Sequence, residues 1–127
     1  LWPVHCVQKT PGSAFVDELN QKKIRKIFQK GQNIEVDSYS GFFDNDQQSS
    51  TGLGEYLESE GIEEVFVVGL ALDYCVKFTA LDAVRLGFKT TVIKDATRAV
   101  NLNEEDDDKA VQEMQEAGIG IINSSQF

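Results

Sequence analysis

Cys75 is the residue whose type and place in the sequence best suit covalent chemistry. The apolar run 65–70 predicts a strand buried on both faces, and Cys75 follows it where a helix is expected to begin. Free N–H groups and the positive end of a helix dipole favour a thiolate there, and the same groups can hold an oxyanion. This position indicates a nucleophile; spacing alone leaves open the alternative of a small buried side chain.

Lys30 and His5 are the two other side chains suited to such a site. Lys30 ends the apolar segment 24–28, and a lysine beside a thiolate stabilises the anion. His5 is the only histidine, so a metal site has one imidazole available, whereas zinc and iron sites usually take three or four protein ligands. The alternatives are a solvated surface lysine and a packed or surface histidine.

Aromatic residues also lie in predicted loops or strand ends: Trp2, Tyr39, Phe42 and Phe43. Rings in such places stack on flat heterocycles, although a core or dimer contact is an equal alternative. The acidic run 104–108 lacks the interleaved spacing and glycine of a calcium loop, so it indicates the start of a helix.

The elements that position these residues alternate between strand and helix. After the strand 65–70 we expect a helix over 75–86, a strand over 89–93, a helix over 104–117 and a strand over 119–122. This order predicts the α/β class, with a doubly wound, mainly parallel sheet and helices on both faces. Ahead of it we expect short strands at 24–28 and 34–36, an exposed polar loop at 44–50 and a helix at 53–60. Ligands of such sheets bind at the carboxyl ends of the strands.

Composition limits the kinds of partner. The 127 residues fit one domain, residues 1–127, and 21 acidic against 12 basic residues give a net charge of −9. Such a surface repels nucleic acid and anionic membranes. The longest apolar run, residues 65–72, is too short to cross a bilayer, which takes about 20 residues. The two cysteines lie far apart and indicate a reducing, cytoplasmic setting.

Three stretches in this order resemble the nicotinamidase/pyrazinamidase family of isochorismatase-like cysteine hydrolases: LWPVHCVQ at 1–8, the segment 30–45 with VDSYSGFFDN, and GLALDYCVKFTALDA at 69–83. The resemblance runs through the whole chain and implies the fold of that superfamily. It also implies hydrolysis of nicotinamide, and of pyrazinamide, to the acid and ammonia through a cysteine thioester, as a step of NAD salvage.

The resemblance further implies roles for individual residues. Cys75 attacks the amide carbonyl, and Lys30 lies beside its thiolate. The peptide between Leu70 and Ala71 is expected to be cis, so that the amides of Ala71 and Cys75 form an oxyanion hole.

Substrate and metal contacts are implied in the same way. Trp2 and Tyr39 match aromatic residues that line the ring pocket, with Leu70 and Ala71 beside them. His5 matches a ligand of a divalent metal, which is Zn, Fe or Mn.

Two motifs of the family are absent from the 127 residues. They are the D-x-Q/N-x-D-F segment with the catalytic aspartate and the D-x-H motif with two further metal ligands. The chain therefore resembles the C-terminal two-thirds of such an enzyme, with the domain incomplete at its N-terminus. We expect the chain alone to hydrolyse nicotinamide negligibly, and its sheet to be completed by an upstream segment or in a homo-oligomer.

Other functions remain open on the sequence. One alternative is a catalytically inactive fragment or family member that acts as a binding or assembly module. Another is an isochorismatase-like hydrolase of a different small substrate, against which the Trp-Pro-x-His-Cys motif at residues 2–6 argues.

Overall fold

The elements lie mostly in the second half of the chain. A computed structural model describes residues 2–127. The strands are β1 (Glu64–Leu70), β2 (Lys89–Arg98) and β3 (Gly120–Ile122). The helices are α1 (Leu53–Ser59), α2 (Lys77–Arg85), α3 (Asp106–Glu116), the π-helical turn η3 (Leu72–Val76) and the 3-10 turns η1 (Pro11–Ser13), η2 (Gln21–Lys23) and η4 (Ser124–Gln126).

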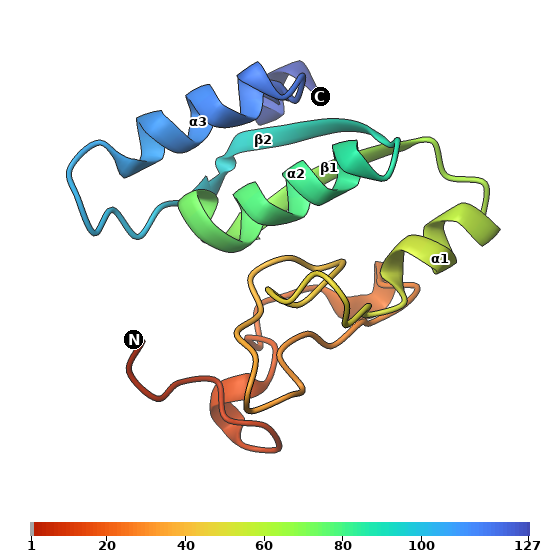
Figure 1. Ribbon diagram of the computed structural model, residues 1–127, viewed down its shortest axis with the longest axis vertical. Helices are drawn as coiled ribbons and strands as arrows, with labels where there is room; N and C mark the ends of the chain where they lie inside the picture. The colour runs from red at the N-terminus through yellow and green to blue at the C-terminus, as the bar shows by residue number, and fades with distance from the viewer. Residues whose placement is uncertain (1) are drawn as a thin grey trace.

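The sheet is parallel, as the alternating pattern predicts. Its strand order is β1-β2-β3, and both neighbouring pairs run parallel. The helices α2 and α3 pack together on one face, where Val76, Ala80, Val92 and Met114 form the main core (Figure 1). Right-handed crossovers between strands in the order β1-β2-β3 place both helices on the same side of the sheet. Helices were expected on both faces of the sheet, but within residues 2–127 they cover one face.

The other face of β1 is open, and the prediction of a strand buried on both faces is wrong for residues 2–127. Phe66, Val68 and Leu70 are 42%, 52% and 71% exposed, because no α-helix among the described residues covers this side. The C-terminal Phe127 ring meets Phe66 edge-on at 4.8 Å. The edge of β1 away from β2 has no partner strand within residues 2–127.

Residues 2–52 run mostly without regular structure, and the strands expected at 24–28 and 34–36 are absent. The apolar side chains Ile24, Ile27 and Ile34 are exposed, and no neighbouring strand pairs with them. The loop at 44–50 is mostly exposed as predicted, but Asp44 is buried.

The C-terminal elements match their predictions closely. The helix at 53–60, the helix at 75–86, the helix at 104–117 and the last strand are confirmed to within a few residues. Strand β2 runs five residues past its predicted end, because Thr97 and Arg98 pair with Gly69 and Leu70 beyond an irregularity in the ladder. Gly87 ends α2 with a φ of 95°, a conformation that favours glycine. Across residues 2–127, no helix combines the length and the apolar character that crossing a membrane requires.

Candidate functional site

Cys75 lies at the carboxyl end of β1, where the sequence places it. The strand ends at Leu70, the Leu70–Ala71 peptide is cis as expected, and Ala71 caps the turn η3. Cys75 is half-buried in this first helical turn, and its thiol is free. Backbone N–H groups at the start of a helix are available to an anion, so the turn is suited to a thiolate.

Lys30 reaches the same sulfur from 45 residues earlier in the chain. Its Nζ lies 3.6 Å from Cys75 Sγ and donates a hydrogen bond of 2.6 Å to the carbonyl oxygen of Ser38. The Ser38 carbonyl thus fixes the ammonium where it faces the thiol. A cation in contact with sulfur favours the ionised form of a cysteine.

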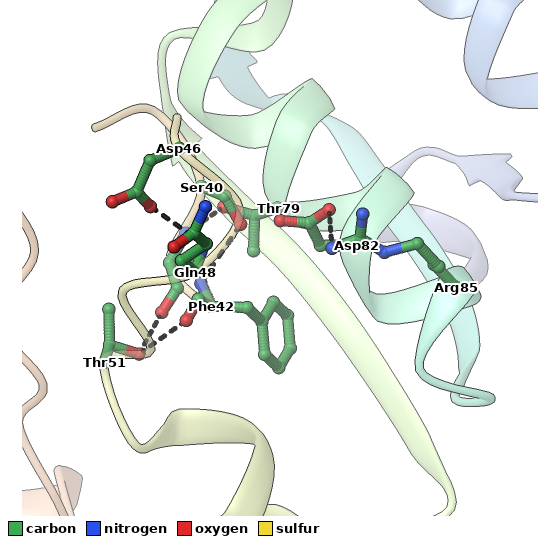
Figure 2. A network of polar contacts seen from close by, with 9 residues as sticks. Ser40, Phe42, Asp46, Gln48, Thr51, Thr79, Asp82 and Arg85 are labelled. Carbon is green, nitrogen blue, oxygen red and sulfur yellow. Dashed lines mark hydrogen bonds and ion pairs between the residues drawn. The ribbon is translucent and has the colours of Figure 1, made fainter. Parts of the chain in front are cut away.

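The loop that carries these contacts is anchored on α2. Thr79 Oγ1 accepts a hydrogen bond of 2.9 Å from the amide of Gly41, and Thr51 Oγ1 donates one of 2.7 Å to the Gly41 carbonyl (Figure 2). The buried Asp44 accepts a longer hydrogen bond, 3.4 Å, from the amide of Gly31 next to Lys30. Hydrogen bonds rather than strand pairing therefore hold this irregular segment over the end of the sheet.

Aromatic rings form one wall of the site. Trp2 Nε1 donates a hydrogen bond of 3.0 Å to the Tyr39 hydroxyl, and both rings lie edge-on to Tyr74, at 4.9 and 5.5 Å between centroids. Phe42 is instead a core residue, since it is 3% exposed and stacks on Phe88. Trp2 and Tyr39 thus line the cleft, whereas Phe42 lies in a core cluster with Phe43 packed against it.

A cleft of about 1070 Å³ brings the predicted site residues together. It is lined by all seven of them: Trp2, His5, Lys30, Tyr39, Leu70, Ala71 and Cys75. Their convergence from three distant stretches is a result that no single stretch predicts.

The sequence reasoning did not single out the other lining residues of the cleft, among them Cys6, Asp37, Tyr74 and Val100. Cys6 and Tyr74 are adjacent in the sequence to the predicted residues His5 and Cys75, which is the signal by which they were detectable. Burial raises the pKa of the Tyr74 phenol, and the negative charge of Asp73 adds to the rise. The phenol therefore stays protonated and keeps its O–H as a hydrogen-bond donor.

The described residues do not form a metal site by themselves. Among residues 2–127, no group of three or more His, Cys, Asp and Glu side chains is placed to hold a metal ion. His5 is exposed, and its Nδ1 lies 2.6 Å from the Pro3 carbonyl oxygen, which leaves Nε2 free. His5 thus offers one ligand nitrogen.

We expect the 127-residue chain to bind Zn²⁺ only weakly, because one imidazole does not fill a tetrahedral coordination shell. Isothermal titration with zinc chloride checks this, with His5→Ala as the matched variant. Tight one-to-one binding that His5→Ala abolishes would contradict the expectation and mean that other residues of the chain complete the shell.

Comparisons with known proteins agree with this geometry. The isochorismatase domain family matches residues 1–126. The nicotinamidase of Escherichia coli (strain K12) is 50% identical over 117 residues, which cover 92% of this chain and 55% of that protein. The chain thus spans about half the length of this curated relative.

Solved structures give the same result. A nicotinamidase/pyrazinamidase structure from Acinetobacter baumannii superposes with a TM-score of 0.95 at 45% identity, covering 99% of this chain and 60% of that one. Yeast nicotinamidase bound to the inhibitor nicotinaldehyde gives 0.92 at 40% identity, covering 98% and 59%.

A zinc-containing relative is also similar. The Pyrococcus horikoshii pyrazinamidase in complex with zinc has a TM-score of 0.82 at 36% identity, over 97% of this chain and 63% of that one. The family match extends through the sheet, the turn of Cys75 and the loop of Lys30. The chain belongs to the isochorismatase-domain family.

Proposed function

We propose that this chain carries the nucleophile half of a nicotinamidase, an amidase that hydrolyses nicotinamide, and also pyrazinamide, to the acid and ammonia. The observation that carries the proposal is the contact of 3.6 Å between Lys30 Nζ and Cys75 Sγ inside an aromatic-walled cleft. The similarity to nicotinamidases supports the same substrate. The same similarity does not favour the alternative of an inactive binding module.

In the proposed reaction Cys75 attacks the amide carbonyl, and Lys30 stabilises the thiolate. The amides of Ala71 and Cys75 receive the developing oxyanion, since both residues line the cleft at the turn η3. The carbonyl C–N bond breaks, ammonia leaves with the proton that the thiol has given up, a thioester remains on Sγ, and water then releases the acid and restores the thiol. The rings of Trp2 and Tyr39, together with Leu70, enclose the pyridine ring.

Proton transfer needs a group besides Lys30. Among residues 2–127, Lys30 is the only hydrogen-bond partner of Cys75 Sγ. The nearby Asp73 carboxylate is directed to backbone amides instead, and His5 bonds to Pro3. We propose that His5 contributes one ligand to a divalent metal, as the zinc-containing relative suggests, and that the enzyme works in the cytoplasm, where its two free cysteines stay reduced.

We expect the isolated 127 residues to release ammonia from nicotinamide at a negligible rate, since no acid or base side chain contacts the sulfur. A coupled ammonia assay on the intact protein tests the proposed activity, and the same assay on the isolated chain tests whether its rate is negligible. Activity of the intact protein on nicotinamide supports the proposed function. If the isolated chain released ammonia and Cys75→Ala abolished that release, the expected negligible rate would be wrong. A residue within the chain would then act as the proton acceptor.

We also propose that the open edge of β1 takes a further strand, from additional sequence or from a second copy of the chain. Unpaired strand edges associate readily. The isolated chain is therefore expected to sediment at a mass above that of one protomer, and Val68→Lys on the exposed face of β1 is expected to reduce this association. A chain that stays monomeric at high concentration would contradict pairing with a second copy and leave additional sequence as the source of the strand.

A further inference from the structure

Asp73 is a buried carboxylate in the turn that carries Cys75. It is 5% exposed and lies two residues before the cysteine in η3. Each of its oxygens accepts one backbone hydrogen bond: Oδ1 from the amide of Val100 and Oδ2 from the amide of Asn101, both at 2.9 Å. Burial of a charge is costly unless such bonds compensate it, so the two contacts fix this side chain in one orientation.

The two amides belong to the loop that leaves β2. Leu70 and Arg98, the last residues of β1 and β2, are paired in the sheet, so Asp73 and this loop lie just beyond the same end of neighbouring strands. Asn101 adopts a φ of 52°, and its side-chain oxygen accepts a hydrogen bond of 2.9 Å from the amide of Asp107 in α3. Asp73 thus connects the cysteine turn to the loop and, through Asn101, to the start of α3.

Both connected parts line the cleft, since Val100 and Cys75 both belong to its wall. We propose that Asp73 is a positioning residue, which clamps the Cys75 turn to the Val100–Asn101 loop and so keeps the sulfur beside Lys30. The inference rests on the proposed role of Cys75 as the nucleophile.

The charge of Asp73 and its clamping role act on Cys75 in opposite directions. A nearby negative charge disfavours a thiolate, so charge alone predicts that its removal makes Cys75 more reactive. The clamp predicts the reverse, because a loosened turn moves the sulfur away from the Lys30 ammonium. The sign of the effect therefore separates the two roles.

The test is alkylation of Cys75 by iodoacetamide at neutral pH, in a Cys6→Ala background that removes the exposed second thiol. In Asp73→Asn the side chain keeps nearly the same shape, but one of the two accepting oxygens becomes an NH2 group. This donor then faces a backbone N–H, so one of the two hydrogen bonds is lost. We expect the alkylation rate of Cys75 to fall by about tenfold. This is the lower end of the effect of moving an opposite charge, here the Lys30 ammonium, away from an ionisable group. An unchanged or faster rate in a folded variant, checked by circular dichroism, would overturn the proposal.

Asp82→Asn is the matched control. Asp82 is also buried, at 7% exposure, but it lies in α2 and pairs with Arg85 at 3.1 Å. We expect Cys75 in this variant to be alkylated at the same rate as in the protein with Asp82 unchanged. If Asp82→Asn slowed alkylation as much as Asp73→Asn does, the effect of Asp73→Asn would be explained by general destabilisation, and the proposal would be overturned.

A second measurement needs no substitution. In the native protein the amides of Val100 and Asn101 should exchange slowly with deuterium, and exchange as fast as in an unfolded chain would overturn the clamp even if Asp73→Asn does not fold. Ammonia release from nicotinamide is measured separately in the intact protein. Its absence would refute the proposed function, while alkylation and exchange still decide the role of Asp73.

Discussion

Replacing Cys75 with alanine is expected to lower the rate of ammonia release from nicotinamide by ~10⁴-fold or more in the intact protein, since no covalent intermediate then forms. The substitution removes one half-buried sulfur atom whose only hydrogen-bond partner among residues 2–127 is Lys30 Nζ. Folding should therefore be little affected. The measurement is a coupled ammonia assay with thermal unfolding followed in parallel.

Cys6→Ala is the matched control for this substitution. Cys6 lines the same cleft, but it is exposed and lies in the irregular N-terminal segment rather than in the turn at the end of β1. We expect it to keep most of the activity. An equal loss from both substitutions, or full activity without Cys75, would show that the nucleophile is assigned wrongly.

The fold was predictable where the local sequence pattern belongs to a segment that also finds its partner in the sheet. The run 65–70 and the helix ended by Gly87 were identified because apolar periodicity and a glycine stop agree there. The predicted strand at 24–28 failed because a strand needs a partner, and an apolar run does not reveal whether one is adjacent. For the same reason the pattern of β1 did not reveal that Phe66 and Val68 are exposed on one face.

The candidate site was predictable as a set of residue types, and less so as a set of contacts. Position at the end of a strand indicated Cys75 and Lys30 as candidates but left a buried cysteine and a surface lysine as alternatives, and only the family resemblance favoured the catalytic roles. The clamp by Asp73 was missed because its partners are backbone amides 27 and 28 residues away, and a backbone amide has no residue type to detect.

Replacing Lys30 with methionine is expected to lower the turnover of nicotinamide by ~10²- to 10³-fold, within the range that one positioned polar group contributes to catalysis. Methionine keeps an unbranched side chain of similar length but has no charge. It removes the ammonium 3.6 Å from Cys75 Sγ and the hydrogen bond to the Ser38 carbonyl. The thiolate then loses its only cationic contact among residues 2–127, so iodoacetamide alkylation of Cys75 at neutral pH should slow together with turnover.

Lys26→Met is the control for this substitution, because Lys26 is an exposed lysine of the same irregular segment outside the cleft. It should leave both turnover and alkylation unchanged. Lys30→Arg separates the effect of charge from that of shape, because arginine keeps the positive charge but spreads it over a larger planar group. We expect Cys75 in Lys30→Arg to be alkylated faster than in Lys30→Met, while the turnover of nicotinamide stays low. If Lys30→Met retained wild-type turnover, the contact between Nζ and Sγ would have no part in catalysis, and the proposed amidase would need another source of thiolate stabilisation.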